Sequence, residues 1–132
     1  MDTPERYRQR LEDFRRALTK LEDGLEQAQS ELEHDGVIQR FEFTFEQGWK
    51  AARLWLLHKN IDVRNARDTL RAAMEQGLIE DGNLWSRIQE ARNLTSHTYN
   101  EKTAEDVFAF VRSEGAEALN GLYNKLIETP PQ

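Results

Sequence analysis

Cysteine is absent from this chain of 132 residues, and proline and glycine are scarce, at 3 and 7 residues. Without cysteine there is no disulfide, no thiolate nucleophile and no cysteine zinc site. No apolar run approaches the ~18 residues that a membrane-spanning helix needs, and no apolar stretch behind the N-terminus could serve as a signal peptide. These absences indicate a cytoplasmic protein without a membrane role.

An excess of basic residues is also missing. The formal net charge is −6 at pH 7. Because proteins that coat duplex nucleic acid usually carry a basic face, this balance argues against general DNA or RNA binding. Contact with RNA through one local basic cleft stays open.

What the chain does contain is amphipathic periodicity. Hydrophobic residues make up 38% and charged residues 32% of the sequence, a mixture that suits helices with one buried stripe each. The length favours one domain over residues 1–132. No strand pattern or internal repeat is present. We therefore expect an all-α fold, an antiparallel bundle of about five helices around a four-helix up-and-down core.

The first predicted helix covers residues 5–33 and carries a heptad seam. The seam consists of apolar residues alternately four and three apart: Tyr7, Leu11, Phe14, Leu18, Leu21, Leu25, Ala28 and Leu32. Such a seam is typical of one helix in an antiparallel bundle, and an intermolecular coiled coil is the alternative. Residues 34–36 are expected to break the helix.

The second predicted helix, residues 37–59, is apolar around more of its circumference. This predicts a central position or a second face against another subunit. Gly48 is expected to permit close approach of a neighbouring backbone. Trp49 is expected in the core and Trp55 at an interface.

Three shorter helices should follow. Asp62 is the expected N-cap of the third and Gly77 its stop. The fourth should begin near Asp81 or Asn83 and run into residues 92–99. Thr103 is the expected N-cap of the fifth, which should end before residues 129–131.

The third helix carries a basic cluster of Arg64, Arg67 and Arg71, spaced by three and four residues. These are the candidate substrate-binding residues, for RNA or for a docking partner. A solvated face paired with acidic neighbours is the alternative. No ligand spacing for a metal accompanies His34 or His58, so no metal site and no cofactor are expected.

Residues 92–99, Arg-Asn-Leu-Thr-Ser-His-Thr-Tyr, contain the chain's densest set of chemically active groups. Arginine can hold a phosphate, histidine can move a proton near neutral pH, and RNA supplies its own 2′-hydroxyl nucleophile. Phosphodiester attack is the chemistry that suits them. In the structural alternative, Arg92 forms ion pairs with Glu90 or Asp81, and His97 and Tyr99 pack at a helix end.

Helix geometry limits how these groups converge. Residues five apart are rotated by about 140°, so Arg92 and His97 cannot share a face of an unbroken helix. Convergence requires a helix end near Ser96 or a second copy of the segment across a two-fold axis.

The segment resembles the motif of the HEPN superfamily, in which an Arg and a polar residue precede a His. Tyr99, two residues beyond His97, is similar to the HepT branch. Residues 41–50 and 77–85 resemble the nucleotidyltransferase substrate-binding subunits of the same superfamily. The resemblance covers residues 41–111, over half the chain.

The resemblance implies a homodimeric helical partner of a minimal nucleotidyltransferase encoded nearby. In the HepT-like branch it implies a metal-independent ribonuclease toxin, silenced when the partner transfers AMP from ATP to the motif tyrosine. Arg92 and His97 would be catalytic, Asn93 would support them, and Tyr99 would accept the nucleotide. The alternative is a non-catalytic subunit that binds substrate for the nucleotidyltransferase.

Overall fold

The computed structural model describes residues 4–131, and over these residues the chain is helical with no strand. This described part contains six α-helices: α1 (Pro4–Gln27), α2 (Glu31–His58), α3 (Ala66–Glu75), α4 (Gly82–Leu94), α5 (Glu101–Phe110) and α6 (Ala116–Glu128). A π-helical turn at Val111–Gly115 joins α5 to α6 as one continuous helical run. That run corresponds to the predicted fifth helix, and the expected all-α bundle is confirmed.

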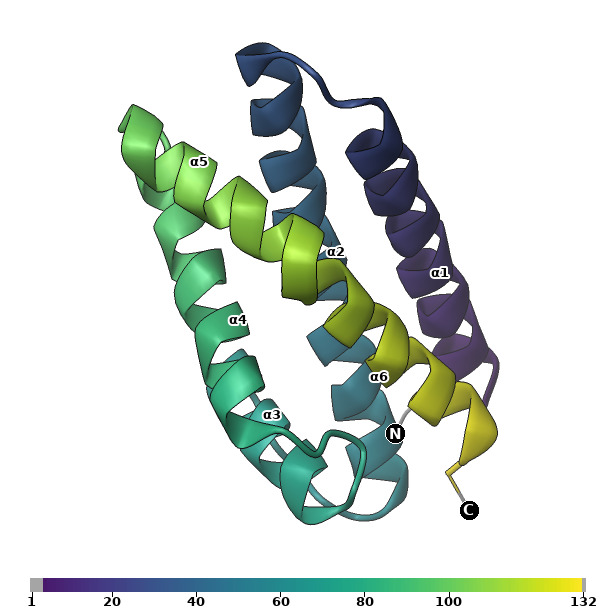
Figure 1. Ribbon diagram of the computed structural model, residues 1–132. Helices are drawn as coiled ribbons and strands as arrows, with labels where there is room; N and C mark the ends of the chain where they lie inside the picture. Colours follow the sequence, from purple (N-terminus) through teal and green to yellow (C-terminus); the bar gives the residue numbers. More distant parts are fainter. Residues whose placement is uncertain (1–3, 132) are drawn as a thin grey trace.

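The four long helical segments alternate in direction. In Figure 1, α1, α2, α4 and the α5–α6 run point up, down, up and down, with α3 a short helix at the lower end. A hydrogen bond from the hydroxyl of Tyr7 to the carbonyl oxygen of Leu126, at 3.4 Å, joins the first helix to the last. The side chain of Tyr7 is buried, and this burial raises the pKa of its phenol. The expectation of one domain over residues 1–132 stays a prediction, and residues 1–3 and 132 lie outside the described part.

Helix α2 is central, as its broad apolar surface predicts. It contacts α1, α3, α4, α5 and α6. Fully buried side chains from several helices, including Phe14, Phe41, Ile88 and Leu119, share one core. The heptad seam of α1 is buried within this core at Phe14, Leu18 and Leu21, as a bundle helix requires.

The predicted break at residues 34–36 is wrong, since α1 ends at Gln27 and α2 already begins at Glu31. Ser30 and Glu33 form a capping box: the Ser30 hydroxyl accepts the Glu33 N–H at 3.1 Å, and the Glu33 carboxylate accepts the Ser30 N–H at 2.9 Å. This cap offsets the roughly 1 kcal/mol that Gly36 costs inside a helix. Leu32, expected in the seam, is 80% exposed on α2.

Two other predicted caps are wrong by a few residues. The N-cap of α3 is Asn65 rather than Asp62, and the N-cap of α5 is Asn100 rather than Thr103. In each case an asparagine side chain accepts a backbone N–H three residues on, which satisfies a free donor of the first turn. The fourth helix begins at Gly82, near Asp81 as predicted, and Asp81 is its N-cap. Gly77 follows α3 with a positive φ of 81°, as expected of its stop.

Two further expectations for α2 are corrected. Gly48 admits the ring of Phe14, not a neighbouring backbone. Trp55 is buried in the chain's own core and donates a hydrogen bond to the carbonyl oxygen of Thr129 at 2.6 Å, so it is not an interface residue. Trp49, expected in the core, packs against it half-buried, and its indole N–H donates to Glu46 at 3.2 Å.

Candidate functional site

Residues 92–99 lie where α4 ends. The helix finishes at Leu94, tightens into a 3-10 turn at Thr95–His97, and then gives way to a short connection before Asn100 caps α5. A helix end near Ser96, one of the two ways in which Arg92 and His97 could converge, is therefore present. It separates Arg92, on the helix proper, from His97 and Tyr99, which follow its last α-helical turn.

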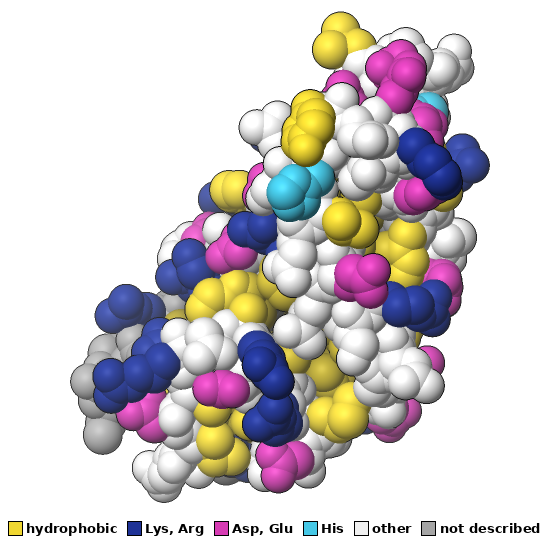
Figure 2. Space-filling view, turned by 90° about the vertical axis from the view of Figure 1, so that its left-hand side faces the viewer, with side chains coloured by type: hydrophobic (Ala, Val, Ile, Leu, Met, Phe, Trp, Pro, Cys, Tyr) yellow, Lys and Arg dark blue, Asp and Glu magenta, His cyan; other side chains and the backbone are white. Residues whose placement is uncertain are grey.

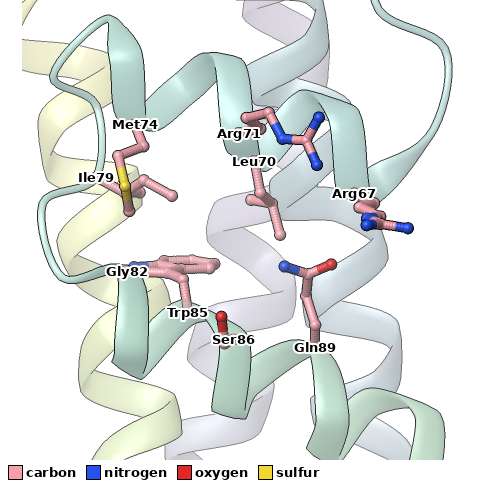
Figure 3. Close-up of a pocket in the computed structure, with 9 residues that line it drawn as sticks. All are labelled: Arg67, Leu70, Arg71, Met74, Ile79, Gly82, Trp85, Ser86 and Gln89. Atoms are coloured by element: carbon pink, nitrogen blue, oxygen red, sulfur yellow. The ribbon is translucent and has the colours of Figure 1, made fainter.

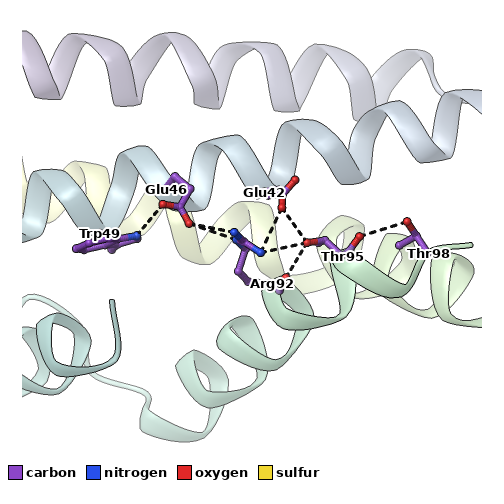
Figure 4. A network of polar contacts seen from close by, with 6 residues as sticks. All are labelled: Glu42, Glu46, Trp49, Arg92, Thr95 and Thr98. Carbon is purple, nitrogen blue, oxygen red and sulfur yellow. Dashed lines mark hydrogen bonds and ion pairs between the residues drawn. The ribbon is translucent and has the colours of Figure 1, made fainter. Parts of the chain in front are cut away.

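Arg92 is held against α2 by two carboxylates. Its Nη1 lies 3.2 Å from Oε2 of Glu42, and its Nη2 lies 3.3 Å from Oε1 of Glu46. Figure 4 shows the guanidinium between the two glutamates, with Thr95 beside it and Trp49 at the far side of Glu46. These partners replace the Glu90 and Asp81 of the structural alternative.

Thr95 completes this network from within the motif. Its hydroxyl accepts a hydrogen bond from Nη1 of Arg92 at 3.3 Å and lies 3.2 Å from Oε2 of Glu42. The side chain of Arg92 is 27% exposed. One guanidinium thus faces two carboxylates, which leaves the network with a net negative charge and anchors the end of α4 to the middle of α2.

His97 and Tyr99 form a second, separate group. Their ring centroids lie 6.2 Å apart at an interplanar angle of 69°. Both side chains are exposed, and Tyr99 is 88% exposed, more than any other large hydrophobic side chain that the structure describes. Asn93 is exposed as well. Within residues 4–131, no hydrogen bond or ion pair joins Arg92 to His97, or Asn93 to His97.

The basic cluster is only partly on one helix. Arg64 precedes the N-cap of α3, is exposed, and pairs with Asp62 at 3.3 Å. Arg67 and Arg71 lie on α3 and line a cleft between α3 and α4 (Figure 3). Figure 2 shows basic side chains gathered over the lower half of this side of the molecule, around exposed apolar ones. The structure therefore brings Arg67 and Arg71 together and leaves Arg64 outside the cleft.

A group of acidic side chains lies at the other end of the bundle, where α2 and α5 begin. The neighbouring carboxylate of Glu101 raises the pKa of Glu31. Nearby, His34 stacks on Phe108 with ring centroids 3.8 Å apart, and its Nδ1 lies 3.1 Å from Glu105. In the part of the chain that the structure describes, no group of three or more His, Asp or Glu side chains is arranged to hold a metal ion.

Sequence reasoning missed Glu42 and Glu46 as partners of Arg92. Their signal was present: they lie four residues apart on the second helix, beside the buried Phe41 and Phe45. Two carboxylates on one edge of a buried face favour a cation on a neighbouring helix. The sequence does not say which helix supplies it.

None of the helices within residues 4–131 is long and apolar enough to cross a membrane.

Comparison with known proteins identifies relatives along most of the chain. The family model described as nucleotidyltransferase substrate binding protein like matches residues 9–128. A Haemophilus influenzae protein named "Probable ribonuclease HepT" is 37% identical over 79 residues, which cover 56% of this chain. The match spans about half of that curated relative, 54% of its length.

Two solved structures share the fold. A crystal structure from Thermus thermophilus has 32% sequence identity and a TM-score of 0.79, and covers 86% of this chain and 98% of its own. A Haemophilus influenzae structure, described as revealing the fold of a substrate binding domain of a nucleotidyltransferase, has 27% identity and a TM-score of 0.77. It covers 89% of this chain and 98% of its own. The resemblance that residues 41–50, 77–85 and 92–99 carry is confirmed.

Proposed function

This chain belongs to the family described as nucleotidyltransferase substrate binding protein like, and from that membership we propose that it is the helical partner of a minimal nucleotidyltransferase. In this proposal the protein acts in the cytoplasm as a metal-independent endoribonuclease toxin. The partner inactivates it by transferring AMP from ATP to Tyr99. The name of the Haemophilus influenzae relative supports the ribonuclease assignment.

The observation that carries the proposal is the exposure of Tyr99 beside His97. An acceptor hydroxyl must reach the active site of another enzyme, and Tyr99 is 88% exposed. In the transfer, the phenolic oxygen bonds to the α-phosphorus of ATP, the bond to the leaving pyrophosphate breaks, and the phenolic proton passes to a base or to water. Because the rings of Tyr99 and His97 lie 6.2 Å apart, the attached AMP would cover the histidine.

The proposed cleavage uses the RNA 2′-hydroxyl as nucleophile. His97 accepts the hydroxyl proton as the oxygen attacks the adjacent phosphorus, the bond to the 5′-oxygen breaks, and that oxygen leaves with a proton. Arg92 stabilises the charge on the phosphate oxygens, and Asn93 contacts the substrate. Since no hydrogen bond or ion pair joins Arg92 to His97 within residues 4–131, a homodimer that juxtaposes two copies of residues 92–99 would complete the site.

A specific observation favours the alternative, a non-catalytic substrate-binding subunit. The charge of Arg92 is already balanced by Glu42 and Glu46 at 3.2 and 3.3 Å, so a phosphate has to compete with two carboxylates. The net charge of −6 also opposes RNA binding. In this alternative, residues 92–99 are a surface that the nucleotidyltransferase binds.

RNA cleavage in the presence of EDTA separates the two functions. The proposal predicts cleavage by the wild-type protein, loss of cleavage in His97→Ala, and retention in Ser96→Ala, an exposed neighbour that serves as the matched control. Arg92→Ala is expected to lose cleavage too. Equal cleavage by the wild type and His97→Ala rules out the assigned site, and a purified dimer that cleaves no RNA favours the alternative.

The acceptor role of Tyr99 has its own test. Incubation with the partner and ATP should add the mass of one AMP to the peptide that carries Tyr99, and Tyr99→Phe should abolish the addition. The other two tyrosines, Tyr7 and Tyr123, are buried and half-buried and act as internal controls. AMP on Tyr99→Phe, or an unmodified wild type with an active partner, contradicts the role.

A further inference from the structure

A cleft of about 320 Å³ lies between α3 and α4 (Figure 3). Its volume lies at the lower end of the range of roughly 300–1,000 Å³ that is typical of small-molecule sites. Arg67 and Arg71 line it from α3, and Ser86 and Gln89 line it from α4, with the amide of Gln89 turned toward α3. Polar groups from two helices therefore face one hollow.

The two arginines are available to a ligand. Arg67 and Arg71 are four residues apart, so they lie on one face of α3. Neither forms an ion pair or hydrogen bond within residues 4–131, whereas Arg87 and Arg92 are paired with glutamates. Two unpaired guanidinium groups beside one cleft suit an anion with several oxygens, and phosphate matches their fork geometry best.

The floor of the cleft suits a flat apolar group. The indole of Trp85 forms this floor and is only 6% exposed, and Met74 lines the same cleft. Met74 packs closely over Gly82, where an added Cβ would lie 3.0 Å from the methionine methyl carbon. A methionine side chain is flexible and repacks readily, so Met74 can move aside and let a ring lie against the indole.

From these features, we propose that the cleft binds a nucleoside phosphate. The phosphate lies between Arg67 and Arg71, and the base lies against Trp85 with Met74 displaced. Ser86 and Gln89 supply the donors and acceptors that a base edge or a ribose requires. A simple anion would make no contact with the indole of Trp85 or with the amide of Gln89, whereas a nucleoside can contact both.

The cleft is close to residues 92–99 along α4. Gln89 and Asn93 are four residues apart, on one face of the helix and about 6 Å apart along its axis. A nucleotide in the cleft thus lies one helical turn from the motif, either as a free nucleotide or as part of an RNA strand. The proposal concerns binding alone and does not depend on cleavage or on AMP transfer.

Titration calorimetry on the full chain tests the proposal with three probes: AMP, a short single-stranded RNA and inorganic phosphate. Arg67→Gln and Arg71→Gln should each weaken binding of AMP or RNA about tenfold or more, since each removes a charged hydrogen bond to phosphate. Arg64→Gln is the matched control, because Arg64 is exposed, lies outside the cleft and should change binding less than about twofold. AMP should also quench a tryptophan signal that Trp85→Phe removes.

The outcomes separate the ligand sources. AMP binding that depends on both arginines supports a free nucleotide, and RNA binding with the same dependence but without AMP binding supports a nucleotide within RNA. Phosphate binding as tight as AMP binding, binding unchanged in Arg67→Gln and Arg71→Gln, or no binding of any probe overturns the proposal. His97→Ala should bind AMP as the wild type does, so loss of the ribonuclease hypothesis would leave this result intact.

Discussion

The guanidinium of Arg92, on α4, lies 3.2 Å from the carboxylate of Glu42, on α2. With Glu46 at 3.3 Å on the next turn of α2, the pair fixes the end of α4 to the centre of the bundle. A residue expected to be catalytic is therefore also a structural anchor. Its substitution affects both stability and chemistry, and the two effects have to be measured separately.

Arg92→Ala should lower the free energy of unfolding by about 1–2 kcal/mol, because it removes two partly exposed ion pairs and leaves two glutamates four residues apart to repel each other. Urea unfolding at neutral pH measures this. Asn93→Ala, an exposed change on the same helix, should stay within about 0.5 kcal/mol of the wild type. An Arg92→Ala variant with the free energy of unfolding of the wild type would show that these ion pairs do not stabilise the fold.

His97→Ala and Tyr99→Phe should leave the free energy of unfolding unchanged within about 0.5 kcal/mol, because both side chains are exposed and share only one ring contact. Thermal unfolding of the purified variants checks this. If the stability is unchanged, any loss of RNA cleavage or of AMP addition in these variants reflects the reaction and not the folding of the protein. A large drop in Tm in either variant would instead indicate packing that the structure does not contain.

Gly48→Ala and Gly36→Ala should have opposite effects although both are on α2. A Cβ at Gly36 meets nothing within 4 Å, whereas a Cβ at Gly48 would lie 3.0 Å from the fully buried ring of Phe14. Gly36→Ala should stabilise by about 0.5–1 kcal/mol through helix propensity. Gly48→Ala should destabilise by about 1 kcal/mol, because overpacking exceeds that gain. Equal stabilisation in urea unfolding would mean that the ring moves at no cost.

Glu31→Gln should have a higher Tm than the wild type at neutral pH, and the difference in Tm should disappear in acid. The carboxylate of Glu101 raises the pKa of Glu31 in the folded protein, so the folded state holds its proton to higher pH than the unfolded state. The free energy of unfolding therefore falls as the pH rises from the unfolded-state pKa of Glu31 through its raised folded-state pKa. Glutamine does not ionise, so the variant does not lose this stability. Glu5→Gln, which also removes a first-turn carboxylate, controls for the helix dipole. A constant Tm difference across pH contradicts the prediction.

Helix types and most helix ends follow from local chemistry. Asp81 caps α4 and Gly77 follows α3 because a side-chain acceptor and a positive φ are properties of short segments. The end of α1 was predicted wrongly for a local reason as well. The capping box of Ser30 and Glu33 outweighs the helix-breaking tendency of residues 34–36.

The candidate site could be predicted only in part. Periodicity places Arg67 and Arg71 on one face, but the cleft they line depends on Trp85 and Gln89, which α4 brings to them. Helix geometry shows that Arg92 and His97 can converge only if the helix ends between them or a second copy contributes. The helix does end at Leu94, but no hydrogen bond or ion pair within residues 4–131 joins the two side chains. Local helix geometry cannot show that Trp55 donates a hydrogen bond to Thr129, 74 residues away.

Periodicity and motif spacing are local, so the sequence is enough to predict the all-α class and the family resemblance of residues 41–50 and 92–99. It left the second helix either central or facing another subunit, and the packing of α2 against the other helices places it at the centre. The tertiary structure sets the partners of those charged groups that pair between helices. Arg92 pairs with Glu42 and Glu46 instead of Glu90 or Asp81, while Arg67 and Arg71 stay unpaired beside a cleft. Ion pairs between helices depend on which faces the core packing brings together, and many pairings are compatible with one amphipathic pattern.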